Sequence, residues 1–176
     1  MELQKIELEL LTEQNIDAVR AIHREDISEE WVDNADTIME LTQYGLDHNC
    51  IGHTYAVRYG EEYIGVILLG EAIPWETDPP EMKGVPFYRL MRFVIDNRYR
   101  TKGIGGYVLE MVIESIYHEF GVRPIALGVH KDNHGAAALL GQECDGRCHH
   151  GGQFTEVCSS GRSDALLLGK GVQAWI

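Results

Sequence analysis

The sequence predicts a single α/β domain of the α+β kind. Three observations support this class. Short β-rich runs alternate with amphipathic helical segments between Lys5 and Val129. A strand, a glycine-rich turn and a long helix follow one another from Tyr88 to Phe120. The chain has 176 residues, of which 44% are hydrophobic, so we expect one core of ordinary size and no second domain.

The first third of the chain predicts one strand and two helices. Residues Lys5 to Leu10 alternate apolar and polar side chains, which is typical of a half-buried strand. Thr12 offers an N-cap hydroxyl, and apolar residues then recur at helical spacing through about Arg24. A second helix is expected from about Asp36 to Tyr44, ending near Gly45.

Two further strands and a loop are expected next. Residues 53–59 and 62–69 are β-rich runs joined through Gly60 and Glu61, which indicates a hairpin. Residues 73–86 contain most of the prolines together with acidic and aromatic residues, and they predict a loop. This loop is either a solvated connection or a surface that helps to collect a cationic amine.

The central unit begins with a near-continuous apolar run from Tyr88 to Ile95, typical of a strand buried on both faces. A helix is expected from about Gly103 to Phe120, where apolar residues recur at helical spacing, and Gly121 ends it. Pro124 then starts another buried strand that reaches Val129.

The turn from Arg100 to Gly105 is suited to holding a phosphate, because free N–H groups and the helix dipole favour an anion there. No glycine starts a Walker A pattern, which excludes that loop. A dinucleotide fingerprint fits poorly, because Val108 stands where a third small residue is needed. The residues do match R-x-x-G-x-G, with Gly103 as its first glycine; an ordinary strand-to-helix turn is the structural alternative.

With this motif, and with residues 129–136 fitting V-x-x-x-N-x-x-A, the chain resembles the GNAT family of acetyl-CoA-dependent N-acetyltransferases. The resemblance covers about Ile6 to Leu140, and the run RFVIDNRYRTKGIGG looks most like bacterial spermine/spermidine (diamine) acetyltransferases. It implies a mixed, mostly antiparallel sheet with helices on both faces. It also implies a V-shaped opening between the strand at residues 88–95 and the strand after Pro124.

The resemblance implies acetyl-CoA as co-substrate and no metal. The strand backbone would bind the pantetheine arm as an added strand does, and the backbone of the turn would surround the pyrophosphate. The resemblance gives these expected cofactor-binding residues: Phe93, Val94, Ile95, Arg100, Thr101, Lys102, Gly103, Ile104, Gly105, Gly106 and Asn133.

Acetyl transfer needs groups that take up the amine proton and protonate the leaving thiolate. Family members commonly offer a Glu or Asp on the motif strand and a Tyr on a later helix. This chain has Met91 or Arg92, and Leu140, at those positions, so Glu71 and Tyr88 are the candidate catalytic residues. A structural role is the alternative for each. The missing Tyr and Glu also raise the alternative of a non-catalytic acyl-CoA-binding module.

The net charge of −13 argues against nucleic acid as a partner, because a duplex binder normally carries a basic face. It favours a small cationic amine, a polyamine first, with a protein amine as an alternative acceptor. The sequence shows no basic leader and no apolar run long enough to span a membrane, so a cytoplasmic protein without a membrane partner is expected. A homodimer is left open.

Residues 141–176 depart from the family pattern, so the predicted domain is 1–140. The segment is rich in glycine and lacks the helix end and closing strands that the family has. A shifted reading frame and a lack of stable order are two explanations. A zinc site is a third alternative, with plausible ligand types but unfamiliar spacing, formed by Cys144, Cys148, His149, His150 and Cys158.

Overall fold

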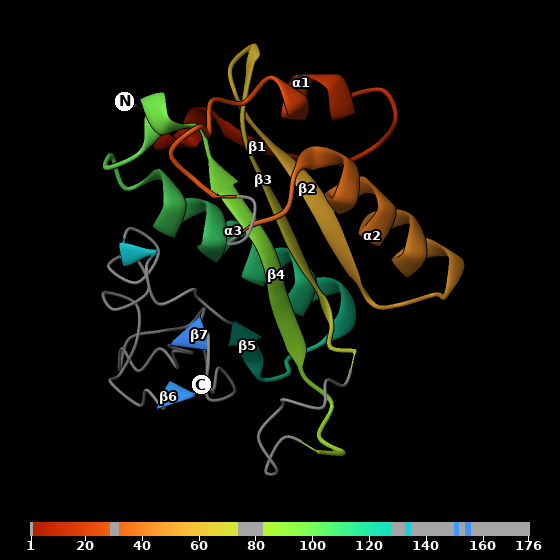
Figure 1. The fold of residues 1–176 in the computed structure, drawn as a ribbon. Helices are drawn as coiled ribbons and strands as arrows, with labels where there is room; N and C mark the ends of the chain where they lie inside the picture. Colours follow the sequence, from red (N-terminus) through yellow and green to blue (C-terminus); the bar gives the residue numbers. More distant parts are fainter. Residues whose placement is uncertain are drawn as a thin grey trace.

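The computed structural model describes residues 2–28, 32–73, 83–127, 133–134, 150–151 and 154–155. Its centre is a five-stranded sheet with the order β1-β2-β3-β4-β5. The first four strands are mutually antiparallel, and β5 runs parallel to β4. This confirms the mixed, mostly antiparallel sheet (Figure 1). The strands are β1 (Ile6–Leu10), β2 (Gly52–Tyr59), β3 (Glu62–Glu71), β4 (Tyr88–Ile95) and β5 (Ile125–Leu127), with a separate pair β6 (His150–Gly151) and β7 (Phe154–Thr155).

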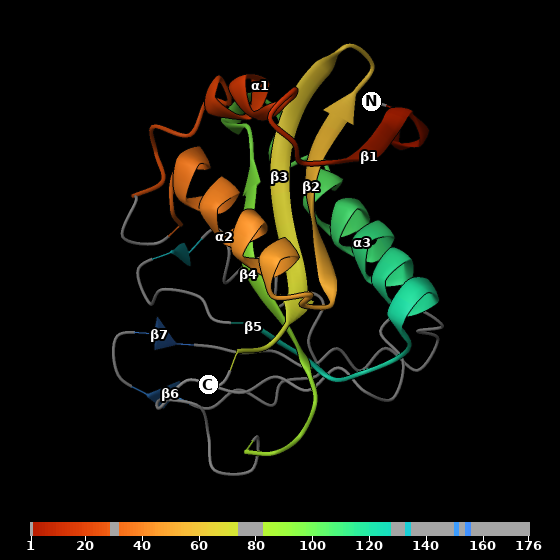
Figure 2. The same ribbon diagram turned by 90° about the vertical axis from the view of Figure 1, so that its right-hand side faces the viewer.

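Helices cover both faces of the sheet, as predicted. Figure 2 shows α1 (Ile16–Arg20) and α2 (Ala35–Asp47) on one side and α3 (Ile104–Phe120) on the other. Each face therefore has its own apolar core. Two short 3-10 turns, η1 (Leu3–Lys5) and η3 (Asn97–Tyr99), precede β1 and follow β4.

The element that differs most from expectation is α1. It ends at Arg20 rather than near Arg24, because the chain turns after Ala21, the C-cap. The backbone N–H of His23 then donates to the Asp96 carboxylate at 3.0 Å instead of continuing a helix. A partner 73 residues away in the sequence thus sets this helix end.

The start of α2, at Ala35, agrees with the sequence pattern, whereas its end differs. Asn34 caps the helix, since its side chain accepts a hydrogen bond from the Thr37 N–H at 3.0 Å. The helix continues through Gly45, where the pattern predicts its end, and stops at Asp47. A glycine favours a helix end only when it takes a left-handed conformation, and Gly45 is not among the glycines with positive φ.

The predictions for the last part of the chain mostly concern residues outside the described ranges. After His134 the structure describes only the backbone pair β6 and β7. The division of the chain at residue 140, the shifted frame and the zinc ligands therefore stay predictions. Among the helices that are described, none is both long enough and apolar enough to cross a bilayer.

Gly65 of β3 allows β3 and β4 to approach closely, which yields a first prediction. A Cβ atom there would lie 2.7 Å from the Val94 carbonyl oxygen and 2.7 Å from Ile95 Cδ1. We expect Gly65→Ala to lower the free energy of unfolding by about 1–3 kcal/mol, because a buried backbone must shift. Urea unfolding followed by circular dichroism measures this.

Gly45→Ala on α2 is the matched control. The nearest atom to its new methyl group is Cys50 Cβ at 3.9 Å, so the space is open. Alanine favours a helix over glycine by about 1 kcal/mol, and this variant should be as stable as the wild type or more so. A Gly65→Ala variant with wild-type stability would contradict the close approach of the two strands.

Candidate active site

A bulge divides β4 into two halves. β3 and β4 pair Leu68 with Arg92 and Leu69 with Leu90, so Met91 has no residue opposite it. One extra residue in a strand reverses the side to which the following backbone groups point. The two halves of β4 therefore present different backbone groups to the same edge.

After the bulge, alternate residues of β4 turn their backbone away from β3. The Asp96 N–H donates to the Ile64 carbonyl of β3 at 2.7 Å. Residue pairs in an antiparallel ladder alternate between hydrogen-bonded and non-hydrogen-bonded. The backbone N–H and C=O groups of Val94 therefore also face β3, whereas those of Phe93 and Ile95 face the opposite edge of β4. Two of the three predicted strand residues thus point their backbone outward.

Within the described residues, that opposite edge of β4 is open over its second half. In this part of the chain β5 pairs with β4 from Tyr88 to Leu90. Among the residues that the structure describes, no strand pairs with this edge from Met91 to Ile95. We call it the open edge. An extended chain of a ligand can pair with such an edge as an added strand does.

The open edge leads directly into a turn with exposed N–H groups. The turn contains two left-handed residues, Thr101 at φ +61° and Gly103 at φ +77°. The first N–H group that bonds into α3 is that of Tyr107, which donates to the Gly103 carbonyl at 3.2 Å. The N–H groups of Ile104, Gly105 and Gly106 precede it at the positive end of the helix dipole and have no acceptor within the helix. We call residues 97–106 the phosphate turn.

The predicted cations of the turn are already engaged with the protein. Arg100 Nε donates to the Ile95 carbonyl at 2.7 Å, and Arg100 also forms an ion pair with Asp26. Lys102 Nζ donates to the Arg98 carbonyl at 2.7 Å. Arg100 therefore closes the end of the open edge, and it leaves the N–H of Ile95, but not its C=O, for a ligand.

Asp96 joins the open edge to the turn, and sequence reasoning missed it. Its side chain is fully buried. The carboxylate accepts hydrogen bonds from the backbone N–H of His23 at 3.0 Å, the backbone N–H of Arg98 at 2.9 Å and the Arg98 guanidinium at 2.9 and 3.0 Å. Burial alone would raise the pKa of Asp96, but these bonds from Arg98 and His23 outweigh it and hold the pKa well below its ordinary value. The sequence signal was an aspartate directly after an apolar strand, two residues before an arginine.

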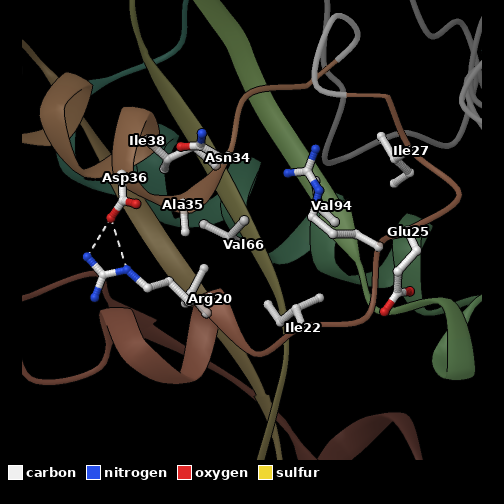
Figure 3. A pocket seen from close by; sticks show the side chains of 12 residues that line it. Arg20, Ile22, Glu25, Ile27, Asn34, Ala35, Asp36, Ile38, Val66 and Val94 are labelled. Atoms are coloured by element: carbon white, nitrogen blue, oxygen red, sulfur yellow. Dashed lines mark hydrogen bonds and ion pairs between the residues drawn. The ribbon is translucent and has the colours of Figure 1, made fainter.

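A pocket of about 450 Å³ lies between α1, α2 and the sheet, beside β4 (Figure 3). Val94 belongs both to the floor of this pocket and to the strand with the open edge, so the two features adjoin. The floor is apolar and the rim is polar: the lining residues are Val19, Arg20, Ile22, Arg24, Glu25, Ile27, Asn34, Ala35, Asp36, Ile38, Val66 and Val94.

The rim of the pocket carries two carboxylates in different states. Asp36 is paired with Arg20, whose Nε lies 2.9 Å from Asp36 Oδ1. Glu25, on the other side of the pocket in Figure 3, contacts Asn97 Nδ2 at 3.4 Å and forms no ion pair within the described part of the chain. Glu25 is therefore the rim carboxylate that is available to a cationic ligand.

The two predicted catalytic residues lie at the opposite end of the sheet from Ile95, where Glu71 pairs with Tyr88. Tyr88 is fully buried, and its hydroxyl donates to the Gly121 carbonyl at 2.8 Å; burial raises the pKa of this hydroxyl. Glu71 accepts from the Arg123 guanidinium at 3.3 Å. These contacts give both residues partners in the segment between α3 and β5, and their catalytic roles stay predictions.

Asn133, the remaining predicted cofactor residue, is partly buried. The residues directly around it, 128–132 and 135–149, lie outside the described ranges. Its contact with the cofactor arm stays a prediction.

Comparison with known protein families gives one match that spans most of the chain. Residues 16–145 match the family model described as the acetyltransferase (GNAT) family. A search of the curated proteins returns no match.

Solved structures share the fold. An N-acetyltransferase from Staphylococcus aureus is 15% identical, with a TM-score of 0.58, over 89% of this chain and 88% of that one. A spermidine N-acetyltransferase from Vibrio cholerae, in complex with CoA and spermine, is 14% identical, with a TM-score of 0.55, over 79% of each chain. A ribosomal-protein-alanine N-acetyltransferase from Brucella melitensis is 12% identical, with a TM-score of 0.54, over 78% of this chain and 89% of that one. Such different acceptors on one fold leave the acceptor of this chain to be argued from its own residues.

The buried carboxylate makes stability depend on pH. Asp96→Asn replaces an acceptor that faces several donors, and we expect the free energy of unfolding at pH 7 to fall by about 1–3 kcal/mol. Because the folded-state pKa is lowered, the carboxylate stabilises the fold above its ordinary pKa of 3.8, and this contribution is lost as the pH falls below that value. The difference between wild type and variant should therefore narrow between about pH 4 and pH 2.

Urea titrations at several pH values measure this difference. The control is Asp17→Asn, which removes an exposed pair with Arg20 and should change stability by less than about 1 kcal/mol. A difference for Asp96→Asn that stays constant down to about pH 2 would show that the carboxylate is not held ionised by its donors.

Proposed function

Because the chain belongs to the GNAT acetyltransferase family, whose members are N-acetyltransferases that use acetyl-CoA, we propose that it acetylates the primary amine of a polyamine or of another small cationic amine. The observation that carries the proposal is the meeting of three features at one end of β4. The open edge, the phosphate turn and the apolar pocket all adjoin the stretch from Phe93 to Asp96.

Backbone groups fit acetyl-CoA at this place. The outward groups of Phe93 and the N–H of Ile95 suit an extended amide-containing arm, and the free N–H groups at the start of α3 suit phosphate oxygens. Acetyl-CoA supplies the acetyl group as a thioester. In the proposed arrangement the Ile95 N–H donates to the carbonyl oxygen that becomes negatively charged during transfer.

The pocket supports an acceptor with an aliphatic body and a charged end. Its floor of valine and isoleucine side chains suits the methylene chain of a polyamine, and Glu25 suits an ammonium group. Val94 places the pocket directly beside the open edge. The net charge of −13 also favours approach of a polycation, since charge of one sign raises the encounter rate of the other.

The cofactor site is tested by ligand-induced stabilisation. Acetyl-CoA at 100 times its Kd should stabilise the folded protein by about 2.7 kcal/mol and raise the thermal midpoint. Gly103→Glu should abolish the rise, because a carboxylate then stands beside the phosphates. Scanning fluorimetry across an acetyl-CoA titration gives the readout.

Gly103→Ala is the control at the same position. Apart from Gly103 and its chain neighbours, no described residue has an atom within 4 Å of a Cβ atom there, so both variants share the cost of a left-handed conformation, about 1 kcal/mol. The difference in binding between them isolates the charge and size of the glutamate. An equal midpoint rise in the wild type and in Gly103→Glu would place the cofactor elsewhere.

The acceptor site is tested by steady-state kinetics with spermidine, following release of the free thiol of CoA. Glu25→Gln should raise the KM for spermidine about twofold to fivefold with little change in kcat, because a rim ion pair contributes about 0.5–1 kcal/mol. Glu40→Gln, an exposed residue of α2 that does not line the pocket, is the control and should leave KM unchanged. Stabilisation by acetyl-CoA without thiol release for any amine would favour the binding-module alternative.

A further inference from the structure

One buried carboxylate bonds to two segments that are far apart in sequence. Asp96 Oδ2 accepts from the His23 backbone N–H at 3.0 Å and from the His23 ring Nδ1 at 3.2 Å. Asp96 Oδ1 accepts from Arg98 at the start of the phosphate turn, through its backbone N–H at 2.9 Å and its Nε at 3.0 Å. The hydrogen bonds from His23 and from Arg98 therefore all end on one carboxylate, that of Asp96.

Three further contacts join the same two segments. The Asn97 N–H donates to the His23 carbonyl at 2.9 Å, so both the N–H and the C=O of His23 are bonded to residues 96 and 97. Asn97 Nδ2 lies 3.4 Å from Glu25, and Arg100 pairs with Asp26. His23, Glu25 and Asp26 therefore contact residues 96–100 after α1 has ended at Arg20, whereas the Arg24 guanidinium donates to the Asp33 carbonyl at 2.6 Å and to the Val32 carbonyl.

The segment held in this way is one wall of the pocket. Ile22, Arg24, Glu25 and Ile27 line the pocket, and Figure 3 shows Ile22, Glu25 and Ile27 together along one side of it. The wall has no helix or strand of its own. Its position therefore depends on contacts with other segments, among them residues 96–100, whose own backbone leads into the start of α3.

We propose that Asp96 is a positioning residue that couples the phosphate turn to the acceptor pocket, so that a ligand bound at the turn also orders the pocket wall at residues 22–27. A phosphate held by the α3 N–H groups restrains the backbone of the turn. Arg98 and Asn97 then hold Asp96 and His23 in one arrangement, and Glu25 stays at the rim. Removing the carboxylate leaves both sites in place and removes the bonds that meet at Asp96, so the connection weakens although the contacts of Asn97 and Arg100 remain.

The proposal differs from a purely structural role for Asp96. If the role of Asp96 is purely structural, Asp96→Asn lowers the free energy of unfolding of the whole domain, and this loss is the same with and without a ligand. The coupling role predicts in addition that a ligand at the turn no longer affects residues 22–27. The inference rests on the proposed function only in taking CoA as the ligand of the turn, and it does not depend on which amine is the acceptor.

Amide hydrogen exchange of the full chain, with and without saturating CoA, tests the coupling. In the wild type, CoA should slow exchange at residues 104–107 directly and at residues 22–27 through Asp96, the latter by at least about fivefold, the lower end of ordinary coupling between sites. In Asp96→Asn, slowing at 104–107 should remain and slowing at 22–27 should fall below about twofold. Asp17→Asn, with the same loss of charge at an exposed side chain of α1, should behave as the wild type.

Arg98→Gln gives an independent variant if Asp96→Asn does not fold. The Arg98 side chain is half exposed, and this change breaks the guanidinium bonds to Asp96 while the His23 contacts remain. It should reduce the slowing at 22–27 at least threefold more than the slowing at 104–107.

Each other outcome contradicts a particular statement. Slowing at both segments in Asp96→Asn, or at 104–107 alone in the wild type, overturns the coupling and leaves the cofactor site intact. No slowing at 104–107 in the wild type overturns the cofactor site and the coupling with it.

Discussion

The arrangement of the site depends on the bulge at Met91 of β4. The backbone N–H and C=O groups of a strand inside a sheet normally all form hydrogen bonds with the two neighbouring strands. The extra residue turns the backbone groups of Phe93 and Ile95 outward, beyond the last residue of β4 that pairs with β5 in the described part of the chain. An unpaired edge is usually a hazard for a protein, because it invites another strand. Here the open edge lies between the phosphate turn and the pocket, and in the proposed function it binds the extended arm of the co-substrate instead of another strand.

Local patterns account for the parts of the fold that the sequence predicted well. The alternation in β1, the hairpin at Gly60 and the apolar run of β4 each depend on neighbours in sequence, and the structure has all three. The glycine turn before α3 belongs to the same group, because only a residue such as Gly103 takes a left-handed conformation without cost. From these local features the sequence predicted the fold class and the position proposed for the phosphate.

Long-range contacts account for the parts that were missed. The apolar residue Ile22 continues the helical period of α1, yet the helix ends earlier because the next N–H bonds to Asp96. The bulge leaves no mark either, since Met91 is neither glycine nor proline and sits in a continuous apolar run. The pocket and the role of Asp96 depend on these two features. The pocket and the contacts of Asp96 could therefore be found only in the three-dimensional structure, whereas β4 and the turn before α3 could be predicted from the sequence.

The state of the cations near the turn shows how an acidic protein with a net charge of −13 fits an anionic co-substrate. Arg98 is bound to Asp96 and Arg100 to Asp26, so most of their charge is already balanced within the protein. In the proposed site, recognition of phosphate rests on oriented backbone N–H groups, which carry partial charge over short distances only. The proposal therefore makes the backbone conformation at Gly103, which orients those groups, more important for binding than the number of lysines and arginines nearby.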